Sequence, residues 1–191
     1  MIEKLAPITA IVQQGKPKNE LAAKNWETSL RLSYLALPVK RVDDIVALKN
    51  PAPLVRIAQE CGEGHVLAAL VVILNDLIDF FNVPNSMDQA QVLYTAGLIR
   101  DEYFYFTIED FKVFSDNAKK RRYGKLFGGI DGSVVFDWLE QYAAERKAAF
   151  AEHNDRKAFS DKERYERRGD VQKVAERELR SILGKNYKPG I

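Results

Sequence analysis

The side chains best able to perform chemistry are few in this sequence, since Cys61, His65 and His153 are its only cysteine and histidines. A thiolate beside an imidazole makes a nucleophile with its base, and Cys61 and His65 lie four residues apart. Gly62 and Gly64 interrupt this stretch, so the two side chains are not expected on one helical face. His153 falls in a charged, solvated stretch. We therefore interpret Cys61 as a buried thiol beside a capped helix start, and we predict no catalytic residue.

Asp76 and Asp79 are candidate metal ligands, because carboxylates three residues apart share one side of a helix. Helical bundles build metal sites from such residues together with Glu-x-x-His pairs, and the sequence contains no such pair. We expect the two aspartates to form a solvent-facing or amide-bonded stripe without a metal. The glycine-containing stretches lack the spacing of a phosphate-binding or dinucleotide-binding loop, so no cofactor is predicted.

The distribution of charge gives the strongest indication of a binding role. Residues 75–110 contain seven acidic side chains and a single basic one, whereas residues 112–125 contain six basic side chains and a single acidic one. The basic stretch continues into a loop that contains glycines. The candidate site, named the basic elbow, consists of seven residues: Lys119, Lys120, Arg121, Arg122, Tyr123, Lys125 and Phe127.

Two interpretations of the basic elbow are open at this point. Its cations would displace the counterions of a phosphate backbone, while Tyr123 and Phe127 stack on bases. Alternatively, cations in the last turn of a helix complement its macrodipole, by ~0.3–1 kcal/mol, and need no ligand. Four consecutive cations also point in all directions around a helix, so one phosphate backbone could not contact all of them. The elbow is thus a predicted contact site for nucleic acid or for a protein partner.

The composition is that of an ordinary globular protein. The chain has 191 residues, of which 46% are hydrophobic and 29% charged, and its formal net charge is +2. Such charges give no overall field that would attract nucleic acid or a membrane. Residues 1–12 carry two charges and a proline, unlike a secretory signal, and the longest apolar run is too short for a bilayer. With a single cysteine, these features predict a cytoplasmic location and no membrane partner.

Apolar residues recur at helical spacing along most of the chain, which predicts an all-α fold. A single multi-helix domain is expected over residues 1–150 and a charged helical extension over residues 151–191. Within these, helices are expected at residues 19–37, 42–46, 51–58, 66–81, 86–101, 107–124 and 131–150. The helix at 66–81 is apolar around most of its circumference, so it is placed at the centre of the domain. Gly169 is expected to divide the extension into two helical pieces.

A capping box is predicted at Ser86, which would accept from the backbone N–H of Gln89 while the Gln89 side chain reaches back, and it would begin one helix. Thr107, with Asp110 three residues later, is predicted as the N-terminal cap of the next helix.

The remaining turns carry signals of their own. Gly124 is expected to close a helix in the left-handed conformation, and Asp131 to cap the helix that follows. The four aromatic residues 103–106 are interpreted as a tight connection whose rings fill the core, and base stacking is the alternative.

Residues 87–146 resemble a family of uncharacterised helical proteins, a domain of unknown function from Bacteroidetes and their mobile elements. The residues that carry the resemblance are Ile99, Glu102, Tyr103, Thr107, Asp110, Phe111, Tyr123, Gly124, Lys125, Ile130, Asp131, Gly132, Trp138, Leu139, Tyr142 and Arg146. The resemblance implies a bacterial cytoplasmic protein connected with mobile-element DNA, and it carries over no catalytic residue.

These observations predict a non-enzymatic binding or adaptor protein, a nucleic-acid-associated accessory factor of a mobile element that uses the basic elbow. The alternative is a structural or protein-interaction module, or a homo-oligomeric scaffold, without a nucleic-acid role. In that case the acidic 75–110 and basic 112–125 segments would pair with a partner, or with each other across a homodimer. A dimer that dissociates as salt rises would favour this alternative.

Overall fold

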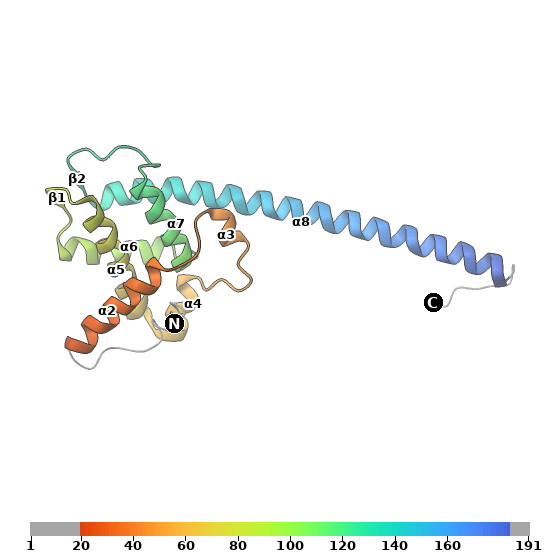
Figure 1. The fold of residues 1–191 in the computed structure, drawn as a ribbon, viewed down its shortest axis with the longest axis horizontal. Helices are drawn as coiled ribbons and strands as arrows, with labels where there is room; N and C mark the ends of the chain where they lie inside the picture. Colours follow the sequence, from red (N-terminus) through yellow and green to blue (C-terminus); the bar gives the residue numbers. More distant parts are fainter. Residues whose placement is uncertain (1–19, 184–191) are drawn as a thin grey trace, which may run out of the picture. The chain divides into compact units, whose positions relative to one another are not determined.

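A computed structural model of the chain describes residues 20–183, which form seven helices and one pair of short strands (Figure 1). The helices are α2 (Glu20–Leu35), α3 (Val42–Val46), α4 (Leu54–Cys61), α5 (Glu63–Phe81), α6 (Gln89–Glu102), α7 (Ile108–Lys119) and α8 (Gly132–Leu183). The strands β1 (Asn85–Ser86) and β2 (Gly129–Ile130) pair in parallel. The all-α prediction is therefore confirmed. Residues 1–12, for which the sequence predicted no secretory signal, lie outside the described part.

Contacts within the chain separate two compact units, residues 1–146 and residues 147–191. The boundary expected from the sequence lay after residue 150. Helix α8 contributes its first turns to the first unit and its remainder to the second.

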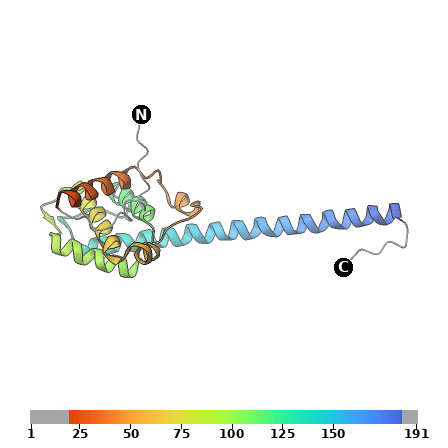
Figure 2. The same ribbon diagram turned by 90° about the horizontal axis from the view of Figure 1, so that it is seen from below.

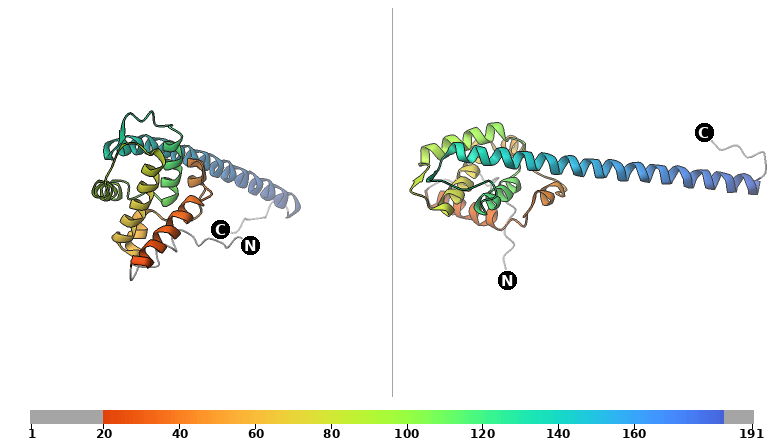
Figure 3. Two further views of the ribbon diagram at one scale, coloured as in Figure 1. Left: turned by 60° about the vertical axis from the view of Figure 1, so that its left-hand side comes forward. Right: turned by 90° about the horizontal axis from the view of Figure 1, so that it is seen from above.

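The prediction of a central apolar helix is confirmed by α5. It contacts α2, α4, α6 and α7, and Figures 2 and 3 show α2 and α6 on opposite sides of it. Val66, Leu70, Ile73 and Leu77 recur at helical spacing along α5, and each is at most 2% exposed. Burying each of these side chains contributes ~1.5–3 kcal/mol, so the hydrophobic stabilisation of this unit is centred on α5.

Of the two predicted helix caps, the one at Thr107 is present and the one at Ser86 is displaced. The Thr107 N–H donates to Asp110 Oδ2 at 2.7 Å, and the Asp110 N–H donates to Thr107 Oγ1 at 3.1 Å. The prediction for Ser86 was wrong, because Ser86 lies in β1 opposite Ile130. Asp88 caps α6 instead, by accepting from the Gln91 N–H at 2.8 Å. Its Asp-x-x-Gln spacing supplies the same reciprocal bonds two residues later.

The end of α7 differs from the prediction. The helix ends at Lys119, and Arg121 takes the left-handed conformation there, with φ of 59°. Gly124 also has a positive φ, of 119°, but it lies five residues after the end of the helix and does not close it. The turn at Arg121 lets the Arg122 N–H donate to the Asn117 carbonyl at 3.1 Å, which satisfies an acceptor in the last turn of the helix. Asp131 behaves as predicted, because its Oδ1 accepts from the Val134 N–H at 3.0 Å at the start of α8.

The aromatic connection at residues 103–106 fills the core with only half of its rings. Tyr103 and Phe106 are buried, whereas Phe104 and Tyr105 are 51% and 40% exposed. The backbone around these rings is held by bonds to the start of α4. Phe106 and Phe104 carbonyls accept from the N–H groups of the first two residues of that helix, at 2.7 and 2.9 Å. Residues 103–106 form a turn in which the Phe106 N–H donates to the Tyr103 carbonyl at 2.9 Å, so the rings at its two ends are buried and the two in its middle are exposed.

A fully buried carboxylate connects α7 to α8 in the first unit. Asp110 is 0% exposed, and its Oδ1 accepts from the Tyr142 hydroxyl at 2.7 Å and from Arg146 Nε at 2.8 Å. The Arg146 guanidinium also lies over the rings of Tyr105 and Phe106, at 5.4 and 5.3 Å from their centroids. A buried carboxylate is tolerated only when it is paired and hydrogen-bonded, so this network fixes how α8 packs on α7.

The second unit contains the charged part of α8, and the expected break at Gly169 is absent because α8 is continuous from Gly132 to Leu183. Residues 151–165 are all exposed. Ion pairs one turn apart join Glu152 to Arg156 and Glu163 to Arg167. Such pairs add ~0.2–0.5 kcal/mol each, and together with long runs of good helix-forming residues they offset the ~1 kcal/mol cost of one glycine.

Replacing Arg146 with Met should lower the free energy of unfolding by ~3–5 kcal/mol, because the buried Asp110 carboxylate would lose its cation. Urea denaturation followed by circular dichroism measures the change. The matched control is Arg56→Met, whose ion pair with Glu60 is exposed to solvent and is worth less than ~1 kcal/mol. Equal losses in the two variants would contradict the assigned role of Arg146.

Replacing Gly169 with Ala should stabilise α8 locally by ~0.5–1 kcal/mol, since glycine in a helix interior carries that penalty. The expected result is slower hydrogen exchange of the backbone amides between residues 165 and 173. A chain whose helix were interrupted at residue 169 would show no such slowing.

Candidate functional site

The basic elbow is divided by the structure into an exposed part and a buried part. Lys120, Arg121, Arg122, Lys125 and Phe127 are exposed, and Phe127 is 85% exposed. Their positions follow from the end of α7 at Lys119 and from the loop that runs to β2. Lys119 and Tyr123 are partly buried, and their side chains face the interior of the unit.

The charge of Lys119 is engaged inside the first unit. Its Nζ lies 2.5 Å from Asp76 Oδ2 and 5.4 Å from the centroid of the Phe80 ring. Its side chain is only 15% exposed. Lys119 therefore joins α7 to α5, and the structure does not bring it together with the exposed cations of the elbow.

The predicted environment of Asp76 was wrong. Asp76 is 5% exposed, and besides Lys119 it binds Arg31 of α2, whose Nε lies 3.0 Å from Oδ1. The carboxylate is buried because α2 and α7 pack on the polar stripe of α5, and a buried charge needs cations rather than amides. Asp79 is 63% exposed and lies 3.7 Å from an Arg31 nitrogen, so the solvent-facing prediction holds for Asp79.

Tyr123 packs inward instead of presenting its ring. The ring stacks on Phe114 with centroids 5.8 Å apart, and the Tyr123 carbonyl accepts from Gln141 Nε2 at 3.4 Å. Burial raises the pKa of Tyr123 to about 12. Tyr123 thus anchors the loop to α7 and α8, and its ring face is unavailable for stacking on a base.

The exposed part of the elbow concentrates positive charge. Among the residues that the structure describes, Lys120, Arg121, Arg122 and Lys125 form no ion pair. Arg121 keeps a left-handed backbone, which costs a residue other than glycine ~1–3 kcal/mol when the surroundings impose it. Four cations within six residues, with Phe127 beside them, make a compact and accessible cationic surface.

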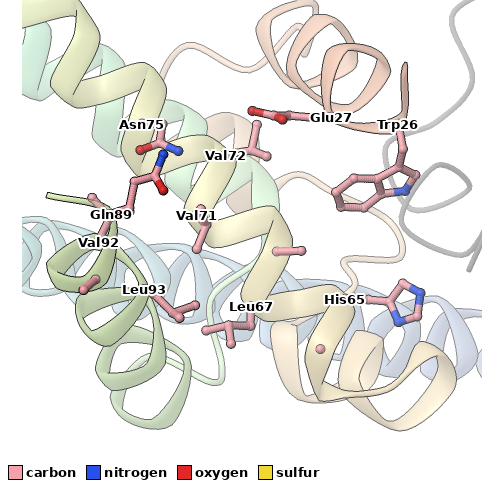
Figure 4. Close-up of a pocket in the computed structure, with 13 residues that line it drawn as sticks. Trp26, Glu27, His65, Leu67, Val71, Val72, Asn75, Gln89, Val92 and Leu93 are labelled. Atoms are coloured by element: carbon pink, nitrogen blue, oxygen red, sulfur yellow. The ribbon is translucent and has the colours of Figure 1, made fainter. Parts of the chain in front are cut away.

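An apolar groove in the first unit was not foreseen from the sequence. It has a volume of about 870 Å³ and lies between α2, α5 and α6 (Figure 4). Its lining consists of Trp26, Glu27, Gly64, His65, Leu67, Ala68, Val71, Val72, Asn75, Gln89, Ala90, Val92 and Leu93. The only sequence signal was that α5 is apolar on nearly all sides, and this pattern does not separate a groove from a filled core.

The residues weighed for catalysis and metal binding are arranged as follows. Cys61 ends α4 and is half-buried, and burial raises the pKa of its thiol, which disfavours the reactive thiolate. His65 lies in the first turn of α5 and lines the groove. Within residues 20–183, no group of three or more His, Cys, Asp or Glu side chains is placed to hold a metal ion.

Helix α5 is long and apolar enough to cross a membrane by length and composition. The central helix of a globular unit passes the same test, and half of the most apolar window of α5 is buried.

Comparison with protein-family models, curated proteins and solved structures found no significant match. The resemblance carried by residues 87–146 therefore stays a prediction.

The neighbouring residues Lys119 and Lys120 give a matched pair of substitutions. Lys119→Met should lower the free energy of unfolding by ~1–3 kcal/mol, because Asp76 loses one of its two cations. Lys120→Met should change it by less than ~0.5 kcal/mol, because the side chain is exposed. Urea denaturation of both variants measures the difference. Indistinguishable midpoints would contradict the assigned ion pair.

Proposed function

We propose that this chain is a non-enzymatic binding protein that holds the phosphate backbone of nucleic acid at the exposed part of the basic elbow. The observation that carries the proposal is the group of four exposed cations without an ion partner among the described residues, next to an exposed phenylalanine. The resemblance over residues 87–146 makes mobile-element DNA the expected source of that nucleic acid.

The electrostatic argument is local, since the net charge of the chain is only +2. Several acidic side chains of the 75–110 segment are occupied within the first unit. Asp76 and Asp110 are buried in ion pairs, Asp88 caps α6, and Asp101 binds Arg100. These acids therefore do little to cancel the field at the elbow, which acts over a Debye length of ~8 Å at physiological salt.

The chemistry of the surface favours a single strand. A phosphate backbone releases counterions when cations replace them, and this needs no regular groove. Phe127 offers a ring face to an unstacked base, and such stacking is worth ~1–3 kcal/mol per base. Bases stacked inside a duplex would not reach that ring.

The double variant Lys120→Gln/Arg122→Gln tests the proposal. Each phosphate contact on a single strand contributes ~0.7 to the slope of log affinity against log salt, so the variant should lower that slope by ~1.4. Fluorescence anisotropy with a labelled oligothymidylate measures it. Phe127→Ala should weaken binding without changing the slope.

The matched control is Lys40→Gln/Lys49→Gln, which removes the same charge at two exposed positions far from the elbow in the sequence. It should leave affinity and salt slope close to those of the parent. No salt-sensitive binding by the parent, or equal losses in the two double variants, would overturn the proposal.

A second candidate function is a protein-interaction module, and the outer face of α6 favours it. Tyr94 and Leu98 are 71% and 41% exposed, and they border a hollow of about 300 Å³ beside Phe136. A homodimer through this face would persist as salt rises, because its contacts are apolar. Light scattering at low and high salt separates this candidate from a dimer held by the acidic and basic segments, because only the ionic dimer would dissociate as salt rises. The ionic dimer is also less favoured, since Asp76 and Lys119 already pair with each other inside the first unit.

A further inference from the structure

Phe80, in the last turn of α5, is an exposed aromatic residue next to the basic elbow. It is 58% exposed, and its ring centroid lies 5.4 Å from Lys119 Nζ. Phe80 follows Asp76 by one helical turn, so the two share a side of α5, and Lys119 contacts both. Lys119 is the last residue of α7, and the exposed cations begin at the next residue. The contact that positions the ring is therefore adjacent to the start of the cationic surface.

The backbone brings the same two segments together at a second point. After α5 the chain runs through residues 82–84 into β1, and after the elbow it runs into β2 (Figure 1). Asn85 of β1 pairs with Gly129 of β2. A Cβ atom on Gly129 would lie 2.5 Å from the Asn85 carbonyl oxygen, so glycine permits this close approach. The loop 120–128 and the segment 80–85 are thus joined at both ends, by the contact of Lys119 with Phe80 and by the strand pair.

This arrangement limits how far the two exposed rings lie from each other. Phe127 precedes Gly129 by two residues, which span at most ~7 Å of backbone, and Phe80 precedes Asn85 by five residues, which span at most ~18 Å. Paired strands lie only ~4.8 Å apart. Proteins that bind single strands commonly contact ~4–16 nucleotides. Both rings therefore lie within reach of one short oligonucleotide.

The contacts of Phe80 hold its ring in place without covering it. The ring meets the Phe81 ring edge to face, with centroids 5.4 Å apart and an interplanar angle of 87°. Phe81 packs in turn on Trp138, with centroids 5.6 Å apart. A ring that is already fixed loses little conformational entropy when a base stacks on it. More than half of the Phe80 surface is open to solvent and accessible to a base.

The acids next to Phe80 are balanced by cations. Asp76 and Asp79 lie on the same helix, and both are within ion-pair distance of Arg31, while Lys119 binds Asp76 as well. Two cations thus balance two acids, and this group has no net charge. The ring therefore lies beside a neutral ion cluster, which does not repel a phosphate backbone.

We propose that Phe80 is a second base-stacking residue of the elbow, so that one bound single strand contacts Phe80 as well as Phe127 and the exposed cations. This inference rests on the proposed nucleic-acid function and adds a contact from α5, outside the stretch in which the sequence placed the site. Because the Phe80 side chain has no charge, it contributes to affinity without contributing to the salt dependence.

Phe80→Leu tests the proposal, because leucine keeps an apolar side chain and lacks the ring. The matched control is Phe104→Leu, since Phe104 is 51% exposed and lies outside the elbow. Fluorescence anisotropy with a labelled oligothymidylate should show about tenfold weaker binding for Phe80→Leu with an unchanged salt slope, and parent-like binding for the control. Urea denaturation should give similar midpoints for both variants, because both side chains are largely exposed.

Failure of this inference is distinguishable from failure of the proposed function. If Lys120→Gln/Arg122→Gln lowers affinity and salt slope but Phe80→Leu binds like the control, the elbow keeps its function and the role of Phe80 is wrong. A lower salt slope for Phe80→Leu would also contradict a stacking role. If the parent shows no salt-sensitive binding, the proposed function fails, and the role of Phe80 fails with it.

Photo-cross-linking of the parent chain gives a second measurement that needs no variant. An oligothymidylate that carries iododeoxyuridine forms a bond on irradiation with an aromatic ring that stacks on the modified base. Mass spectrometry of the digested protein should find the oligonucleotide on Phe80 and on Phe127. Attachment to Phe127 with none to Phe80 would overturn the proposal.

Discussion

The first unit depends on a carboxylate that is buried in the middle of its most apolar helix. Asp76 lies on α5, and burying its charge is tolerated only because Arg31 and Lys119 approach it from two other helices. The ion cluster therefore fixes the positions of α2 and α7 on α5. It also decides which cations of the neighbouring basic stretch face the solvent, since Lys119 points inward and the chain turns outward directly after it.

A second buried carboxylate repeats this arrangement at the other end of α7. Asp110 receives the Tyr142 hydroxyl and the Arg146 guanidinium, and both come from α8. Charges that are clustered in the sequence thus serve largely as internal connections between helices. The cations of the short turn that contains Arg121 and Arg122 are exposed to solvent. These exposed cations are the part of the charge pattern that supports a binding function.

Local signals predicted local structure well. The central position of α5 followed from its narrow polar stripe, and the start of α7 followed from Thr107 and Asp110, because these features depend on residues within a few positions of each other. The partners of Asp76 were not predictable, since Arg31 and Lys119 lie 45 and 43 residues away in the sequence. Spacing carries no information on pairs at that distance.

Other errors arose where a longer-range contact overrode a valid local pattern. The Ser86 pattern would have capped a helix, but pairing of β1 with β2 left the start of α6 to Asp88. The groove was not predicted, because the apolar residues Leu67 and Val71 that line it are of the same types as residues that fill a core. Within the candidate site, the sequence did not predict that Phe127 is exposed and Tyr123 buried, since both are aromatic residues of one loop. Long-range contacts of Tyr123 with Gln141, and its stacking on Phe114, distinguish the two residues.

The central claim is that the binding surface begins at Lys120 because Asp76 retains Lys119. Nuclear magnetic resonance of the full chain during titration with a single-stranded oligonucleotide tests it most directly, by following the side-chain Nε–H signals of the arginines. The account predicts that the signals of Arg121 and Arg122 shift while those of Arg31 and Arg146 stay in place. Shifts confined to arginines of the second unit, or no shift at all, would contradict it.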